Sequence, residues 1–268
     1  MSARFLGSQA APIAAHDGAP LLERAGPFLR VTLNRPQQHN RLDPADIDAL
    51  SALLGEIAET AATTPDAVRA LVITGTGEKT FSSGYTLQAI LDELDARFER
   101  MLDALEALPI PTIAAFNGSV YGGATDLALC CDIRIGTPGL KMFMPAAKFG
   151  LHYYAGGLRR YVSRLGLPAA TKLMLTAMTI ETEEMLRIGF LTEVVERESL
   201  GSCVDGYLEH IARTEPVVVA QMKRHLQALA QAQAEGAQAR TLQASMEQAY
   251  AASLRSDELH RRLQALLE

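Results

Sequence analysis

In the first part of the chain, hydrophobic residues form short runs separated by turn residues, which is the pattern of buried strands. The runs cover 28–33, 70–74, 112–116 and 132–135. Asn34-Arg35-Pro36 follows the first run, and Gly75-Thr76-Gly77 follows the second. Because these residue types favour turns, each run is bounded, and we expect a strand at each one.

Longer stretches between these runs have apolar residues at helical spacing. Asp43-Pro44 is typical of a helix N-cap and first helical position, and apolar residues recur after it up to Ile57. A second series predicts a long helix over 87–108, which prolines end. We expect Phe81-Ser82-Ser83-Gly84 to form a loop and Gly122-Gly123 to begin a short apolar helix.

From Gly157 onward the pattern predicts helices alone. The candidates are 158–165, 169–175, 183–188, 200–213 and 217–230, with two more before the C-terminus. Strands that alternate with helices and are followed by a helical tail predict an α/β core with a helical C-terminal region. We divide the chain into a loosely held N-terminal arm (1–18), an α/β core (19–200) and a helical region (201–268).

Composition narrows the possible partners. The 268 residues are 48% hydrophobic and carry a formal net charge of -6, without a run of Lys or Arg. Nucleic acid is therefore not expected as a partner, since phosphate binding needs clustered positive charge. No apolar stretch is long enough to cross a bilayer, so we expect no membrane partner and a cytoplasmic location. The three cysteines match no zinc pattern, and we expect buried thiols and no metal.

Two glycine-containing loops precede predicted helices, and both could bind negative charge. They are Ser83-Gly84-Tyr85 and Tyr121-Gly122-Gly123. The first amides of a helix have no partner inside the helix, and the helix dipole adds positive charge there. If the fold brings the loops together, two amides could stabilise one oxyanion, as on a thioester carbonyl. Alternatively, each loop is only a tight turn.

A set of short motifs lies in collinear order from about residue 20 to 225. The motifs are Leu33-Asn34-Arg35-Pro36 with Asn40, Phe81-Ser82-Ser83-Gly84, 116–123 (FNGSVYGG), Cys131-Asp132-Ile133, Phe149-Gly150-Leu151, Ala155-Gly156-Gly157 and Ile188-Gly189-Phe190. In order and spacing this set resembles the crotonase (enoyl-CoA hydratase/isomerase) superfamily. The resemblance implies a spiral of ββα units and an acyl-CoA substrate, with no separate cofactor. It also implies a homotrimer or a dimer of trimers, assembled through the C-terminal helices.

In this family the oxyanion amides belong to the residues that are Tyr85 and Gly123 here. Ser83, Gly84 and Gly122 are then expected beside the substrate. Typical hydratases of the family add two glutamates, at positions that hold Asp126 and Ala146 in this chain. Ala146 cannot transfer a proton, and Asp126 is one methylene shorter than glutamate, so ordinary two-glutamate hydration and single-glutamate isomerisation are both in doubt. Asp126 either contacts the substrate or only complements the helix dipole.

Near the expected thioester, His152, Tyr153 and Tyr154 follow the FGL-type motif. Tyr153 resembles a tyrosine of the methylmalonyl-CoA decarboxylase branch, so it could orient a substrate carboxylate or donate a proton, with help from His152. Equally, both tyrosines could line the pocket as apolar bulk. Lys223 is a weaker candidate for contacting the CoA phosphates.

We therefore expect an acyl-CoA enzyme of lyase or isomerase type, with decarboxylation and atypical hydration both open. Tyr85, Gly123, Asp126 and Tyr153 are the candidate catalytic residues. The alternative is a non-catalytic CoA-binding or scaffold member that has lost its acid and base.

Overall fold

The computed structural model describes residues 3–5, 8–86, 96–232 and 237–267, and within them the strands form two sheets. The larger sheet has the order β1-β2-β3-β4-β6-β8-β11, and the smaller one β10-β9-β7-β5. The larger sheet comprises β1 (Ala11–Pro12), β2 (Leu21–Ala25), β3 (Phe28–Leu33), β4 (Ala70–Gly75), β6 (Thr112–Ala115), β8 (Ile133–Gly136) and β11 (Glu193–Val194). The smaller sheet comprises β5 (Thr80–Ser82), β7 (Ser119–Tyr121), β9 (Lys141–Phe143) and β10 (Ile180–Glu181).

The centre of the larger sheet is parallel, because helices return the chain to the same edge after each strand. Strands β3, β4, β6 and β8 pair in parallel, with Phe28 opposite Ala70 and Leu71 opposite Thr112. Helix α1 (Pro44–Thr63) makes the first crossover and buries the apolar face that begins at Ile47. This arrangement confirms the predicted α/β core.

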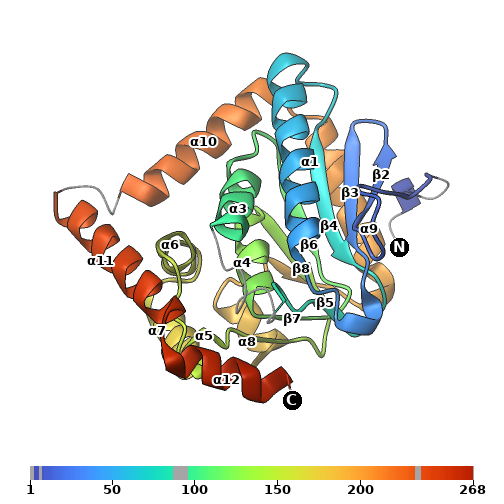
Figure 1. Cartoon of the computed structure of the whole chain (residues 1–268). Helices are drawn as coiled ribbons and strands as arrows, with labels where there is room; N and C mark the ends of the chain where they lie inside the picture. The colour runs from blue at the N-terminus through green and yellow to red at the C-terminus, as the bar shows by residue number, and fades with distance from the viewer. Residues whose placement is uncertain (1–2, 6–7, 87–95, 233–236, 268) are drawn as a thin grey trace.

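Helices cover the sheets and extend away from them at the C-terminal end (Figure 1). They are α1, α3 (Arg97–Ala107), α4 (Gly123–Cys130), α5 (Ala146–Phe149), α6 (Ala155–Leu165), α7 (Leu167–Thr176), α8 (Thr182–Arg187), α9 (Leu200–Ala212), α10 (Pro216–Ala232), α11 (Ala237–Leu254) and α12 (Asp257–Leu267). Helix α10 points away from the core, and α11 and α12 then return along α6 and α5 (Figure 1). The predicted helical C-terminal region is therefore confirmed.

The smaller sheet brings two distant loops together. Strands β5 and β7 are parallel neighbours, with Thr80 opposite Ser119 and Ser82 opposite Val120. Because parallel strands end on the same side of a sheet, the residues after each strand lie close to each other. These residues are the two glycine loops, 83–85 and 122–123.

Two expectations about secondary structure need correction, and a third can be compared only in part. Residues 80–82 form strand β5, so only the end of 81–84 is loop. The second half of the chain is not entirely helical, since β10 and β11 are added to the two sheets. Both are only two residues long, too short for a period of two to be detected. Of the long helix expected over 87–108, the structure has α3 from Arg97, and 87–95 lie outside the described residues.

The N-terminal segment, expected to be loosely held, contacts the core in its described part. Strand β1 pairs with β2, and Phe5 is buried beneath the Arg30 guanidinium. The buried thiols are confirmed for Cys130 and Cys131, where burial raises the pKa, for Cys131 to about 12. Among the described residues, no helix is long and apolar enough to cross a membrane.

Candidate active site

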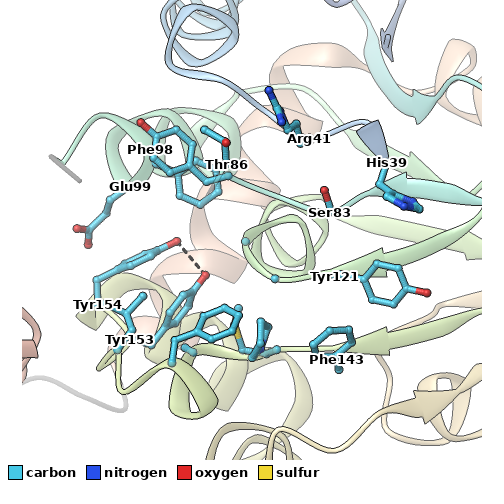
Figure 2. A pocket seen from close by; sticks show the side chains of 18 of the residues that line it. His39, Arg41, Ser83, Thr86, Phe98, Glu99, Tyr121, Phe143, Tyr153 and Tyr154 are labelled. Carbon is cyan, nitrogen blue, oxygen red and sulfur yellow. Dashed lines mark hydrogen bonds between the residues drawn. The ribbon is translucent and has the colours of Figure 1, made fainter. Parts of the chain in front are cut away.

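A cavity of about 450 Å³ opens where the two glycine loops meet α3, α5 and the residues before α6. Figure 2 shows its labelled side chains arranged around the opening. The candidates that line it are Ser83, Tyr85, Gly122, Gly123, Ala146, Tyr153 and Tyr154. Its wall is mostly apolar and aromatic, which is typical of a ligand pocket with few polar groups.

The two loops approach so closely that only glycine fits at their contact. Gly84 has a φ of 82°, and a β-carbon there would lie 2.5 Å from the Gly123 nitrogen. A β-carbon on Gly123 would lie 3.6 Å from the Tyr85 nitrogen. The Tyr85 and Gly123 amide nitrogens therefore lie close to each other, and both residues line the cavity.

The direction of the Tyr85 amide follows from a bridge between Leu42 and Tyr85. Leu42 donates its N–H to the Gly84 carbonyl at 2.8 Å and accepts from the Thr86 amide at 3.0 Å. Successive amides of an extended chain point to opposite sides, so the Tyr85 N–H points away from Leu42. Gly123 is the first residue of α4, and its amide belongs to the turn that has no carbonyl partner inside the helix.

Helix α3 covers this pair of amides. A β-carbon on Gly123 would lie 2.8 Å from the Phe98 ring, so this ring packs directly on the glycine. The same ring stacks on Tyr85 with centroids 5.5 Å apart. The stacked Phe98 and Tyr85 rings give the amides an apolar neighbour, and hydrogen bonds are stronger in such surroundings than in water.

On another side of the cavity, two tyrosines are fixed by a buried carboxylate. The Tyr154 hydroxyl donates to Asp126, and the Tyr153 hydroxyl lies 3.2 Å from the same carboxylate oxygen and 3.3 Å from the Tyr154 hydroxyl. Figure 2 shows the contact between the two hydroxyls as a dashed line. Gly157 permits this packing, since a β-carbon there would lie 2.2 Å from the Tyr153 ring.

The Asp126 carboxylate is completely buried and paired with the equally buried Arg160. The Arg160 guanidinium donates to both Asp126 oxygens, at 2.8 and 3.1 Å, and also to Asp103 and Glu106. Burial is the largest influence on the pKa of Arg160 and opposes its charge, but the charge and hydrogen bond of Asp126, together with Cys130 and Tyr154, raise that pKa above its usual value. The Arg160 guanidinium is therefore charged in the folded protein.

The Asp126 carboxylate also influences the pKa of the two tyrosines. Burial, followed by the negative charge of Asp126, raises the pKa of both Tyr153 and Tyr154 well above the usual value for tyrosine. Both hydroxyls consequently stay protonated at neutral pH. They can donate to Asp126 or, after a rotation, to a ligand in the cavity.

The remaining candidates lie in different surroundings. Asp126, at the start of α4, is not among the residues that line the cavity, and its oxygens face Arg160 and the tyrosines. His152 also does not line the cavity, and its backbone amide donates to Ser253 of α11. Lys223 needs correction as a phosphate contact, because it is buried and donates to the Ile110 carbonyl and Asp132.

Glu99 was missed by sequence reasoning, although it lines the cavity near Tyr154 (Figure 2). Its carboxylate is half-buried and lies beside Gly156 in the first turn of α6. Burial, followed by the like charge of Asp103, raises its pKa. In the sequence it is one of several charged residues on an amphipathic helix, and nothing there distinguishes it from its exposed neighbours.

Comparison with known proteins identifies the family of the chain. The model of the enoyl-CoA hydratase/isomerase family matches residues 23–266. A short-chain-enoyl-CoA hydratase of Clostridium acetobutylicum is 31% identical over 206 residues, which are 74% of this chain and 77% of that protein. An (E)-benzylidenesuccinyl-CoA hydratase of Thauera aromatica is 34% identical over 209 residues, with 76% and 80% covered.

Solved structures show the same fold. A methylmalonyl-CoA decarboxylase in complex with 2-nitronate-propionyl-CoA aligns with a TM-score of 0.81 at 22% identity, covering 92% of this chain and 95% of that one. DspI of Pseudomonas aeruginosa aligns with a TM-score of 0.72 at 29% identity, covering 80% and 89%. The chain belongs to the enoyl-CoA hydratase/isomerase family of the crotonase superfamily.

Proposed function

We propose that this protein turns over an acyl-CoA thioester by holding the thioester oxygen between the Tyr85 and Gly123 amides while an enolate forms. The supporting observation is the contact of the two loops, where a β-carbon on Gly123 would lie 3.6 Å from the Tyr85 nitrogen. Preorganised amides stabilise charge where it develops, and one such donor contributes about 100-fold or more in rate. The chemistry needs no redox cofactor, because no electrons leave the substrate.

The reaction is of lyase or isomerase type, and the pocket differs from that of a two-glutamate hydratase. Ala146 lines the cavity without any acid or base, and the Asp126 oxygens are occupied by Arg160 and the tyrosines. The two sequence relatives named above are hydratases, so hydration or its reverse is the first reaction to test. In this protein it would need a proton-transfer group other than these two residues.

Decarboxylation is the second candidate, favoured by the position of Tyr153 on the cavity wall. Loss of carbon dioxide forms the enolate without a base, and a neutral hydroxyl could orient the departing carboxylate. A Tyr153→Phe variant should then lose turnover of a malonyl-type thioester. Unchanged turnover in this variant would exclude the proposed role of Tyr153.

The central test is a screen of crotonyl-, malonyl-type and 3-hydroxyacyl-CoA thioesters, combined with calorimetric binding of an acyl-CoA analogue that carries a nitronate. The nitronate oxygens imitate an enolate, so the analogue should bind at least about 100-fold more tightly than the parent thioester. Binding of thioesters without turnover of any, and without preference for the analogue, would instead support a non-catalytic CoA-binding or scaffold protein.

We also propose assembly into a homotrimer, or a dimer of trimers, through the C-terminal helices. Helix α10 exposes a series of large apolar side chains, Val217, Val218, Met222, Leu226 and Leu229. Such a series on one helix is typical of a surface that another chain covers. Sedimentation equilibrium should give a mass of three or six chains, and Leu226→Glu should lower it.

A further inference from the structure

Glu99 is the only carboxylate among the described residues that line the cavity. Neither position where the family pattern places a catalytic glutamate supplies one in this chain, since Ala146 has no acid and Asp126 lies outside the cavity wall. A carboxylate from a different element, α3, is therefore available to the substrate. No motif marks this position, so its role can be inferred only from the structure.

Two contacts fix the part of α3 that carries Glu99 at the cavity wall. The preceding residue, Phe98, packs its ring on Gly123. On the other side, the Glu99 Oε1 atom lies 3.1 Å from the position that a β-carbon of Gly156 would occupy. Gly156 belongs to the first turn of α6, which directly follows Tyr154.

The charges around Glu99 make it suitable for proton transfer at neutral pH. Burial raises its pKa most, and Asp103, one turn along α3, raises it further. Asp126 of α4 acts in the same direction, whereas the backbone of Gly156 and Arg160 of α6 oppose it. A carboxylate whose pKa lies closer to the working pH is a stronger base and still gives up its proton readily.

We propose that Glu99 exchanges a proton with the α-carbon of the bound acyl thioester. In the forward direction the α C–H bond breaks, an O–H bond forms on Glu99, and the electron pair moves into the enolate. Its negative charge then rests on the thioester oxygen between the Tyr85 and Gly123 amides. In reverse, the protonated Glu99 returns the proton to the α-carbon. The inference rests on the proposed function, because it needs the thioester at those amides.

The experiment is proton exchange of butyryl-CoA in D₂O, followed by loss of its α-proton signal in NMR spectra. The wild type should incorporate deuterium, and Glu99→Gln should slow this by at least about 100-fold, the usual contribution of a positioned base. Gln keeps the side-chain length and removes the basic carboxylate. Glu59→Gln, on the exposed face of α1, is the matched control and should exchange like the wild type.

The pH profile separates a chemical role from a structural one. The exchange rate of the wild type should fall on the acid side as Glu99 becomes protonated, at a pH above the ordinary carboxylate value of 4.5. Asp103→Asn removes the like charge and should move this limb to lower pH while the plateau is kept. Glu99→Gln should lack the limb altogether.

Binding of the nitronate analogue distinguishes the two possible failures. If the wild type prefers the analogue but does not exchange the α-proton, or if Glu99→Gln exchanges at the wild-type rate, the role of Glu99 is overturned and the amide pair stands. If the wild type neither prefers the analogue nor exchanges, both ideas fail. In the expected case, Glu99→Gln binds the analogue within a few-fold of the wild type and loses exchange.

Discussion

Two sides of one cavity are built from different parts of the chain. The side with Tyr85 and Gly123 consists of backbone amides, placed by glycines and by the pairing of β5 with β7. The opposite side consists of side chains fixed around the buried Arg160, which donates to Asp126 and Glu106. The first side matches the family's motifs, whereas the second departs from them. The backbone side is thus fixed by local geometry, whereas the other side depends on how the side chains of several helices pack.

The largest effect on stability is expected from Arg160→Met, on the side of the cavity that is built from side chains (the side-chain half). This substitution leaves Asp126 and Glu106 without their shared cation in a buried site, which costs about 3–5 kcal/mol of unfolding free energy. Urea unfolding at neutral pH measures it. Arg187→Met, whose side chain is 72% exposed, is the control and should change little. Equal stability of the two variants would show that the cluster does not hold this half together.

The next largest effect is a loss of activity, expected on the side of the cavity that is built from backbone amides (the backbone half). In Gly84→Ala the new β-carbon would meet the Gly123 nitrogen at 2.5 Å, so the two loops must separate. We expect thioester turnover to fall by about 100-fold or more, the effect of losing one oxyanion donor.

Gly26→Ala provides a matched control for backbone strain. Gly26 also has a positive φ, 60°, but a β-carbon there would meet nothing within 4 Å. Both variants should lose about 1–2 kcal/mol of stability from the left-handed conformation, and only Gly84→Ala should lose activity. If turnover falls equally in both, the close contact of the loops is not what positions the amides.

The same contrast explains what the sequence could predict. Gly84 and Gly122 belong to short motifs, in which the local backbone geometry requires glycine. The sequence alone could therefore name Tyr85 and Gly123 as the candidate amide pair. The Asp126–Arg160 pair and the exposure of Glu99 to the cavity arise only when α3, α4 and α6 pack together. Charged residues on these helices look alike in the sequence, because nothing local says which of them becomes buried. Lys223 was misjudged for this reason.

A smaller effect on stability, which depends on acid pH, is expected from Glu106 on the side-chain half. Although burial opposes its charge, hydrogen bonding to Arg159 and the charges of Arg159 and Arg160 lower the pKa of Glu106 in the fold. The folded protein therefore binds this proton less readily than the unfolded chain, and the stabilisation is present above the ordinary value of 4.5 and lost as the pH falls below it. Glu106→Gln should cost about 1–3 kcal/mol at neutral pH.

Unfolding measured between neutral pH and the acid range tests this linkage. The wild type should lose stability more steeply below pH 4.5 than Glu106→Gln, so the two curves should converge there. Parallel curves would mean that Glu106 titrates alike in the folded and unfolded chains, and that its ion pairs do not stabilise the fold.

The smallest effect is a gain in stability, and it is expected from a change at Glu99. Its pKa is raised in the fold, so the charged carboxylate destabilises the folded protein at neutral pH, and this penalty fades as the pH falls through the raised value toward 4.5. Glu99→Gln should therefore stabilise the protein at neutral pH, by at most about 0.5 kcal/mol because the group is half-exposed.

This gain should disappear below pH 4.5, where the wild-type carboxyl is also neutral. If Glu99 contributed to stability, its replacement would destabilise the protein. A variant that is more stable yet cannot exchange the α-proton would therefore show that Glu99 serves the chemistry. Differential scanning calorimetry at neutral and acid pH, with Glu59→Gln beside it, measures the difference. A loss of stability at neutral pH would instead assign Glu99 to the packing of α3 on α6.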